Sequence, residues 1–179
     1  MQERYIKWWT PYLSREFEML VFGSGRGLPL IIFPTSFGRY HQNKDFGMVD
    51  SVAWFVDNDR VTVYCPDSLD LDSFYNKSIH PADRIRTHIA YENVIVHDVA
   101  DFGRREASTH RVGVCGASLG LIMPPTLPSG IPMPSVSSSA SAARSRSAIS
   151  STATTTRTFI STALTNICRT CPTHGNTTT

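Results

Sequence analysis

The sequence predicts an α/β fold with a mostly parallel sheet, and three observations support this prediction. Short apolar runs rich in β-branched residues recur along the first two-thirds of the 179-residue chain. Most of these runs end at a proline or a glycine. Stretches suited to helices separate the later runs, and strands that alternate with helices are joined by crossovers, which make neighbouring strands parallel.

The first predicted strands lie on either side of a glycine-rich turn. Glu16–Phe22 begins as a polar/apolar alternation, so we expect a half-exposed strand near a sheet edge. Residues 23–27 contain three glycines and indicate a turn. Leu30–Phe33 is continuously apolar and is followed by a proline, as expected of a strand buried on both faces.

The following elements alternate between helix and strand. Asp50–Val56 is a short helical candidate, and Arg60–Cys65 is a β-branched strand that a proline closes. Pro81–Glu106 has no internal proline and carries apolar residues roughly on one stripe, so we expect one or two helices. This stripe consists of Ile85, Ile89, Val96, Val99 and Phe102. Arg111–Cys115 is a further buried strand.

The composition changes abruptly near residue 120. The whole chain carries 17 Lys+Arg and 15 Asp+Glu, and a net charge of +2 does not favour binding to nucleic acid or to an anionic membrane. All the acidic residues lie between Glu3 and Glu106, whereas residues 121–179 are rich in Ser, Thr and Pro. We therefore expect the sequence pattern of a folded domain to end near residue 120, with residues 1–120 forming at best a loose, aggregation-prone subdomain and residues 121–179 forming a disordered, low-complexity tail.

The sequence also indicates the compartment. The start of the chain is charged and lacks the apolar stretch of a signal peptide, and the run Leu28–Phe33 is far too short to cross a membrane. We expect a soluble, cytoplasmic protein. Cys65 and Cys115 lie in strand-like runs, which favours two buried free thiols.

A nucleophile-elbow motif follows the last predicted strand. Gly116-Ala117-Ser118-Leu119-Gly120 fits G-x-S-x-G, in which the serine occupies a sharp strand-to-helix turn with its Oγ exposed. Gly116 and Gly120 leave room for that turn, and the N–H of Leu119 is expected to face the developing oxyanion. The alternative is a plain turn at a strand end. The preceding buried strand favours the elbow, with Ser118 as nucleophile.

The loop after Phe33 is the candidate source of a second oxyanion donor. It reads Pro34-Thr35-Ser36-Phe37-Gly38-Arg39-Tyr40, in which Gly38 permits close backbone approach. The N–H of Phe37 or of Gly38 is the candidate donor. An ordinary glycine-containing turn explains the same residues equally well.

Several segments together resemble one known family. They are residues 33–40, 45–48, 67–68, 74–76 and 116–120, and in order and spacing they are similar to α/β-hydrolase esterases of the esterase D and antigen 85 type. The resemblance covers about Tyr5 to Gly120. It implies the N-terminal half of an α/β-hydrolase, strands one to five, that cleaves small-molecule esters with a Ser–Asp/Glu–His triad, no cofactor and no metal, and Ser118 matches the family's nucleophile.

The same family places its acid and histidine downstream of the elbow, and this chain departs from that pattern. No Asp or Glu follows Ser118, and the histidines His41, His80, His88, His97 and His110 precede it. We therefore expect the chain as it stands to be nearly inactive. An acyltransferase or a thioesterase of the same fold remains open, as does a non-enzymatic protein with a disordered interaction tail. The sequence does not indicate an oligomeric state.

The segment 121–179 is interpreted as a frameshift product. Met123 has a single codon, and a shift of one base from Leu121 permits a reading that begins Y-H-A-A-N and resembles the family's next helix. Threonine codons read in this way become Asp, Asn, Tyr or His, which explains a Thr-rich segment without acidic residues. Within it, Cys168, Cys171 and His174 imitate half of a zinc site, but three ligands without supporting structure do not predict a metal.

Overall fold

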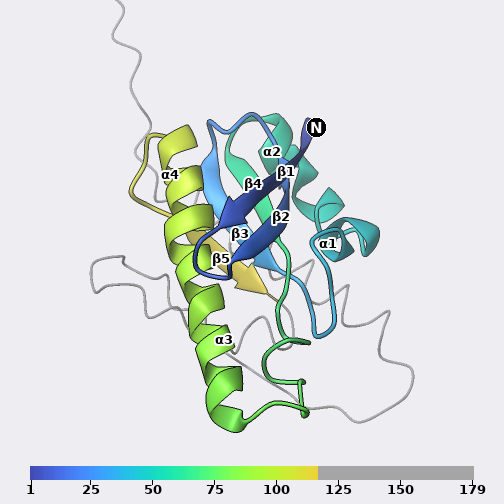
Figure 1. Cartoon of the computed structure of the whole chain (residues 1–179). Helices are drawn as coiled ribbons and strands as arrows, with labels where there is room; N and C mark the ends of the chain where they lie inside the picture. The colour runs from blue at the N-terminus through green and yellow to red at the C-terminus, as the bar shows by residue number, and fades with distance from the viewer. Residues whose placement is uncertain (117–179) are drawn as a thin grey trace, which may run out of the picture.

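The computed structural model describes residues 1–116, which form five strands with helices on both faces of the sheet (Figure 1). The expected tail lies outside the described residues. In chain order the elements are β1 Glu3–Thr10, β2 Arg15–Phe22, β3 Leu28–Phe33, α1 Gln42–Asp45, η1 Asp50–Val52, α2 Ala53–Asp57, β4 Val61–Pro66, α3 Pro81–Asn93, η2 Val94–Ala100, α4 Asp101–Glu106 and β5 Gly113–Gly116. The predicted α/β fold is confirmed, and the predicted strands and helices all occur.

The sheet is mixed, with the strand order β1-β2-β4-β3-β5. Strands β3, β4 and β5 are parallel neighbours, whereas β2 runs antiparallel to both β1 and β4. Four strands therefore point the same way and β2 alone is reversed. The short turn between β1 and β2 explains this reversal, because two consecutive strands joined by a tight turn are antiparallel.

The strand predicted over Glu16–Phe22 lies near an edge of the sheet, as expected, but it is more buried than expected. β2 lies between β1 and β4, one position in from the end of the sheet, and residues 19–22 are buried instead of half-exposed. The edge strand is β1, which the sequence analysis did not predict. β1 alternates between exposed and half-buried residues. By pairing with β2, it occupies the hydrogen-bonding edge that β2 would otherwise leave open.

Helices α3 and α4 are joined through the π-helical stretch η2 into one continuous helical segment. Its predicted apolar stripe is wrong at the N-terminal end, because Ile85 and Ile89 are 56% and 51% exposed. Figure 1 shows the reason: the first half of α3 extends past the sheet. The buried positions begin only at Tyr91, and the wider π turn changes the register of those that follow.

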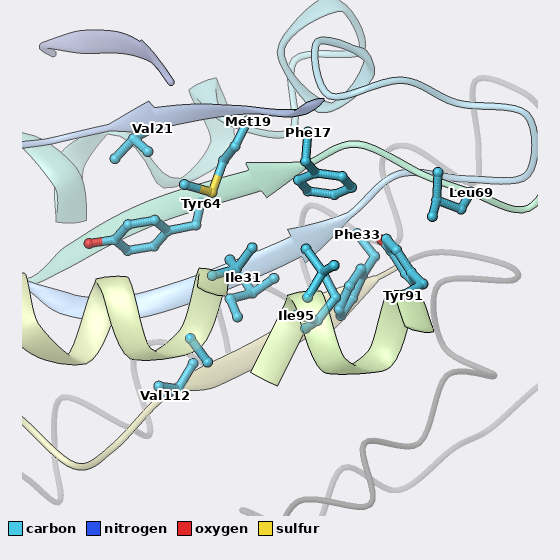
Figure 2. Packing of buried hydrophobic residues seen from close by; sticks show 13 residues of the cluster. Phe17, Met19, Val21, Ile31, Phe33, Tyr64, Leu69, Tyr91, Ile95 and Val112 are labelled. Carbon is cyan, nitrogen blue, oxygen red and sulfur yellow. The ribbon is translucent and has the colours of Figure 1, made fainter. Parts of the chain in front are cut away.

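Two hydrophobic cores lie on the two faces of the sheet. One core joins inward residues of β2, β3 and β4 to α3, η2 and α4, as Figure 2 shows for Met19, Ile31 and Tyr64. The other core packs Leu20, Ile32 and their neighbours against the segment from Met48 to Val56. Strands with helices on both faces bury both of their faces, which explains the continuous apolar run of β3.

A charged cluster joins β1, β4 and α4 at the amino end of the parallel strands. The Arg4 guanidinium donates two hydrogen bonds to Glu106, at 2.6 Å to Oε1 and 2.9 Å to Oε2. The Tyr64 hydroxyl donates to Oε2 of Glu106 at 2.9 Å. The Arg4 hydrogen bonds lower the pKa of Glu106, so the carboxylate is ionised at neutral pH. Bidentate geometry makes this pair stronger than an ordinary surface ion pair.

Candidate functional site

The candidate site is the edge of the sheet at which β3, β4 and β5 end. Parallel strands bring their carboxyl ends to one edge, where α/β folds bind ligands. Strand β5 pairs with β3 from Leu30 opposite Gly113 to Phe33 opposite Gly116. Gly116 is buried and is the last described residue. The other predicted elbow residues, Ser118, Leu119 and Gly120, lie outside the described residues.

The loop after β3 folds into a tight turn against α1. The N–H and the hydroxyl of Thr35 both donate to Oε1 of Gln42, at 2.8 and 2.9 Å. The N–H of Gly38 donates to the Thr35 carbonyl at 2.9 Å. A Cβ on Gly38 would lie 2.0 Å from Oε1 of Gln42, so close approach explains the glycine. The same glycine closes the turn and leaves its N–H engaged.

Phe37 has a left-handed backbone conformation with φ +63°. This conformation is unusual for a bulky residue and requires local support. Its N–H donates to Oδ2 of Asp70 at 2.7 Å, and its ring lies 4.3 Å from that of Tyr75. Tyr75 in turn donates from its hydroxyl to Oγ of Ser36 at 3.2 Å. The loop after β3 is therefore fastened to the loop after β4.

The Asp70 carboxylate is the centre of this fastening. The residue is only 8% exposed. Besides the Phe37 N–H, it accepts the Ser68 hydroxyl at 2.7 Å and the Leu71 N–H at 3.0 Å, both on Oδ1. A buried carboxylate is tolerated when donors surround it in this way. Neither Phe37 nor Gly38 thus presents a free N–H here, and the predicted oxyanion role requires the loop to change.

A second carboxylate, Asp67, lies beside the same loops. The Nε of Arg39 donates to it at 2.8 and 2.9 Å, and the Tyr40 N–H donates at 3.1 Å. Burial raises the pKa of Asp67, while its hydrogen bond to Arg39 acts in the opposite direction. The backbone carbonyl of Asp67 accepts the Tyr91 hydroxyl at 2.8 Å, which ties α3 to this edge. Burial raises the pKa of Tyr91, so it remains a neutral donor.

A small cavity of about 30 Å³ lies between these loops and α3. Its walls include Phe33, Leu69, Phe74 and Tyr91, and polar atoms come from Thr35, Ser68, Asp70, Ser73 and His88. This volume suits about one water molecule, which is smaller than most substrates. Within residues 1–116 the cavity is therefore a small recess at the carboxyl ends of β3 and β4, too small to hold most substrates.

Of the five histidines in the described part of the chain, His88 alone lines this cavity. Its Nε2 lies 3.6 Å from Oε1 of Glu92 one turn along α3, and its ring lies 4.6 Å from that of Phe74. His41 pairs with Asp45 on the surface at 2.7 Å, and His80 caps the start of α3. His41 and His80 therefore have structural roles outside the cavity.

The two cysteines of the described region are free, as predicted. Cys65 is fully buried, whereas Cys115 is only partly buried, so the prediction of two buried thiols holds for the first alone. Burial raises the pKa of Cys65 to about 12 and that of Cys115 to about 11. Neither thiol is activated as a nucleophile, because the thiolate is the reactive form.

Within residues 1–116 no three His, Cys, Asp or Glu side chains are grouped so that they could hold a metal ion. The imitation of a zinc half-site at Cys168, Cys171 and His174 lies outside that part of the chain. No helix of the described segment is long and apolar enough to cross a membrane.

Sequence reasoning identified the loop after β3 but missed Asp70. The signal was present, because Asp67-Ser68-Leu69-Asp70 follows directly after a buried strand and a proline. Polar residues at the carboxyl end of a parallel strand point to the ligand edge of the fold. The contact between Asp70 and Phe37 joins residues on two loops, and no local pattern reveals such a pairing.

Comparison with known proteins gives little further information. No family model matches the sequence, and no curated protein matches it significantly. Among solved structures, the chain is similar to the apoenzyme of S-formylglutathione hydrolase (FrmB) from Staphylococcus aureus, with 11% identity and a TM-score of 0.36. The match covers 66% of this chain and 50% of that one, so the chain spans about half the length of the structure it matches. A likeness at this level carries no conclusion about activity.

Proposed function

We propose that the edge formed by β3, β4 and β5 is the N-terminal half of a serine-esterase active site with Ser118 as nucleophile. The observation that supports this most directly is the parallel pairing of β5 with β3, which puts Gly116 opposite Phe33. β5 therefore ends, at Gly116, at the edge where the loop 34–40 begins, and the motif that contains Ser118 continues from Gly116 in the sequence. This is the strand-then-loop context that the G-x-S-x-G elbow requires.

In the proposed reaction Ser118 attacks the carbonyl carbon of a small ester and the alcohol leaves. Water then hydrolyses the acyl-enzyme and releases the acid. The N–H of Leu119 and one from the Phe37–Gly38 turn hold the oxyanion. The second donor becomes available only if the turn releases Asp70 or Thr35. No cofactor enters this chemistry.

The chain as it stands is expected to be a very poor enzyme. A serine hydroxyl is a weak nucleophile without a base, and loss of a triad member lowers the rate by several orders of magnitude. No carboxylate side chain follows Ser118, and His88 belongs to the α3 wall of the cavity. The frameshift interpretation explains why the chain lacks the acid and the histidine of the triad. A cytoplasmic location also stays a prediction from the sequence.

The test measures hydrolysis of p-nitrophenyl acetate by the purified chain and by Ser118→Ala. We expect equal, near-background rates. A chain produced after the single-base change that restores the Y-H-A-A-N frame serves as the comparison, and we expect a fluorophosphonate probe to label it at Ser118. A large Ser118-dependent rate in the unrepaired chain contradicts the predicted inactivity. A repaired, folded chain that the probe does not label contradicts the esterase proposal.

A further inference from the structure

The outer edge of β1 carries a pattern of residues that is complementary to itself. Within residues 1–116, β1 ends the sheet and pairs only with β2. Its outward-facing residues alternate along the strand as Glu3, Tyr5, Lys7 and Trp9. Tyr5 is 52% exposed and Trp9 is 64% exposed. Long edge strands with large exposed side chains are templates for pairing with another chain.

The backbone N–H and C=O groups of these four residues point away from β2. The N–H of Gly23 donates to the carbonyl of Gln2 at 2.8 Å, and the register between β1 and β2 continues from Glu3 opposite Phe22. Hydrogen-bonded and non-bonded pairs alternate along an antiparallel ladder. The even residues of β1 therefore bond to β2, whereas the odd residues direct their N–H and C=O groups to the free edge.

We propose that this edge binds a second copy of the chain, so that two β1 strands pair antiparallel around a two-fold axis at Tyr5. In this register Glu3 lies opposite Lys7 of the second copy, Lys7 lies opposite its Glu3, and the two tyrosines face each other. Both residues of every such pair are odd, so their outward backbone groups meet as hydrogen-bonded pairs. A two-fold interface needs a self-complementary surface, and this one supplies it.

The charges select the register instead of blocking the edge. Charged residues usually protect an edge strand, and like charges placed directly opposite each other are unfavourable. Shifts that put Glu3 opposite Glu3, or Lys7 opposite Lys7, are disfavoured by repulsion. Within one copy Glu3 contacts Lys44 and Lys7 contacts Glu16, but these pairs are exposed and contribute little. In the dimer, Glu3 and Lys7 can keep these contacts and also pair with Lys7 and Glu3 of the second copy.

The test is the mass of the purified full-length chain, measured by sedimentation and by light scattering over a range of concentrations. We expect a closed dimer. Lys7→Glu turns both charge pairs into repulsions and raises the dimer dissociation constant about tenfold or more. The double variant Glu3→Lys/Lys7→Glu restores opposite charges across the axis and returns the constant to within about threefold of wild type, although it disrupts both contacts within each copy.

Tyr5→Pro gives an independent test, because the Tyr5 N–H points to the free edge and the backbone hydrogen bonds between β1 and β2 remain, although the hydrogen bond from the Tyr5 hydroxyl to Glu18 is lost. We expect a folded monomer, with the melting temperature confirming the fold. A wild-type chain that stays monomeric at all concentrations overturns the proposal. Failure of the double variant to regain the dimer overturns it as well. Open-ended association that the variants at residues 3 and 7 leave unchanged also contradicts the proposal, since the contact then lies at another edge.

Discussion

The stability of the loop after β3 should depend on the carboxylate of Asp70, and the substitution Asp70→Asn tests this dependence. The substitution keeps the size of the side chain but replaces one acceptor oxygen with a donor. If the amide nitrogen faces the Phe37 N–H, two donors oppose each other across a contact that now measures 2.7 Å. If it faces the other way, it opposes the Leu71 N–H. Either orientation loses a hydrogen bond to a charged group, which contributes about 1.5–3 kcal/mol.

Hydrogen exchange at the Phe37 amide measures this loss directly. A local opening free energy lower by about 1.5–3 kcal/mol corresponds to exchange that is roughly tenfold to 150-fold faster. Asp72→Asn is the matched control on the same loop, because its pair with Arg15 is about half exposed on both sides. We expect that control to change the exchange at Phe37 less than about twofold, since exposed pairs contribute little.

The outcome that refutes the reasoning is specific. Equal exchange rates at Phe37 in the wild type and in Asp70→Asn would mean that the contact with the carboxylate does not hold the turn. Faster exchange across all strands would indicate general destabilisation instead. Only a change confined to residues of the two loops after β3 and β4 supports the proposed fastening.

Two further predictions concern stability. The pKa of Glu106 is lowered in the folded state, so its contribution to the free energy of unfolding is complete above its unfolded pKa and is lost as pH falls through the lower folded value. The free energy of urea unfolding should therefore fall less between about pH 5 and pH 3 in Glu106→Gln than in the wild type. Parallel curves for the two proteins would contradict this. Gly38→Ala should lower the free energy of unfolding by about 1–3 kcal/mol because the new Cβ would overlap Gln42. Gly113→Ala is the control and should lower it less, since its Cβ would meet Leu30 only at 3.1 Å. Equal urea midpoints for the two variants would show that the turn accepts the Cβ without strain.

The buried parts of the fold were predictable because their sequence pattern is strong. Leu30–Phe33 is a continuous apolar run and Arg60–Cys65 is rich in β-branched residues; a proline follows each, and both are central strands. Strand β1 escaped prediction because it mixes aromatic and charged residues in an edge environment. The apolar pattern of α3 misled at Ile85 for a related reason, since helical periodicity does not show how far the helix extends beyond the sheet.

The candidate site was predictable only in part. The elbow and the loop after β3 are local motifs, so the sequence pointed to Gly116 and to Gly38. The Phe37 N–H is engaged by a contact between separate segments, since it donates to Asp70 on the loop after β4, whereas the Gly38 N–H donates to Thr35 within its own turn. The contact between Asp70 and Phe37 depends on the relative placement of two loops, which sequence periodicity does not encode. The roles predicted for Ser118 and Leu119 stay predictions.

The strand order also determines the order in which the sheet can assemble. The β1–β2 hairpin closes across a short turn, whereas β3 must wait for β5, which follows only after β4 and the whole segment from α3 to α4. Closing the longer loop costs on the order of 3 kcal/mol more chain entropy than closing the hairpin. During synthesis, one edge of β3 therefore stays open until Gly113–Gly116 leaves the ribosome. The backbone that leads to Ser118 is then among the last segments to be fixed, and a slow final docking step should limit the folding rate.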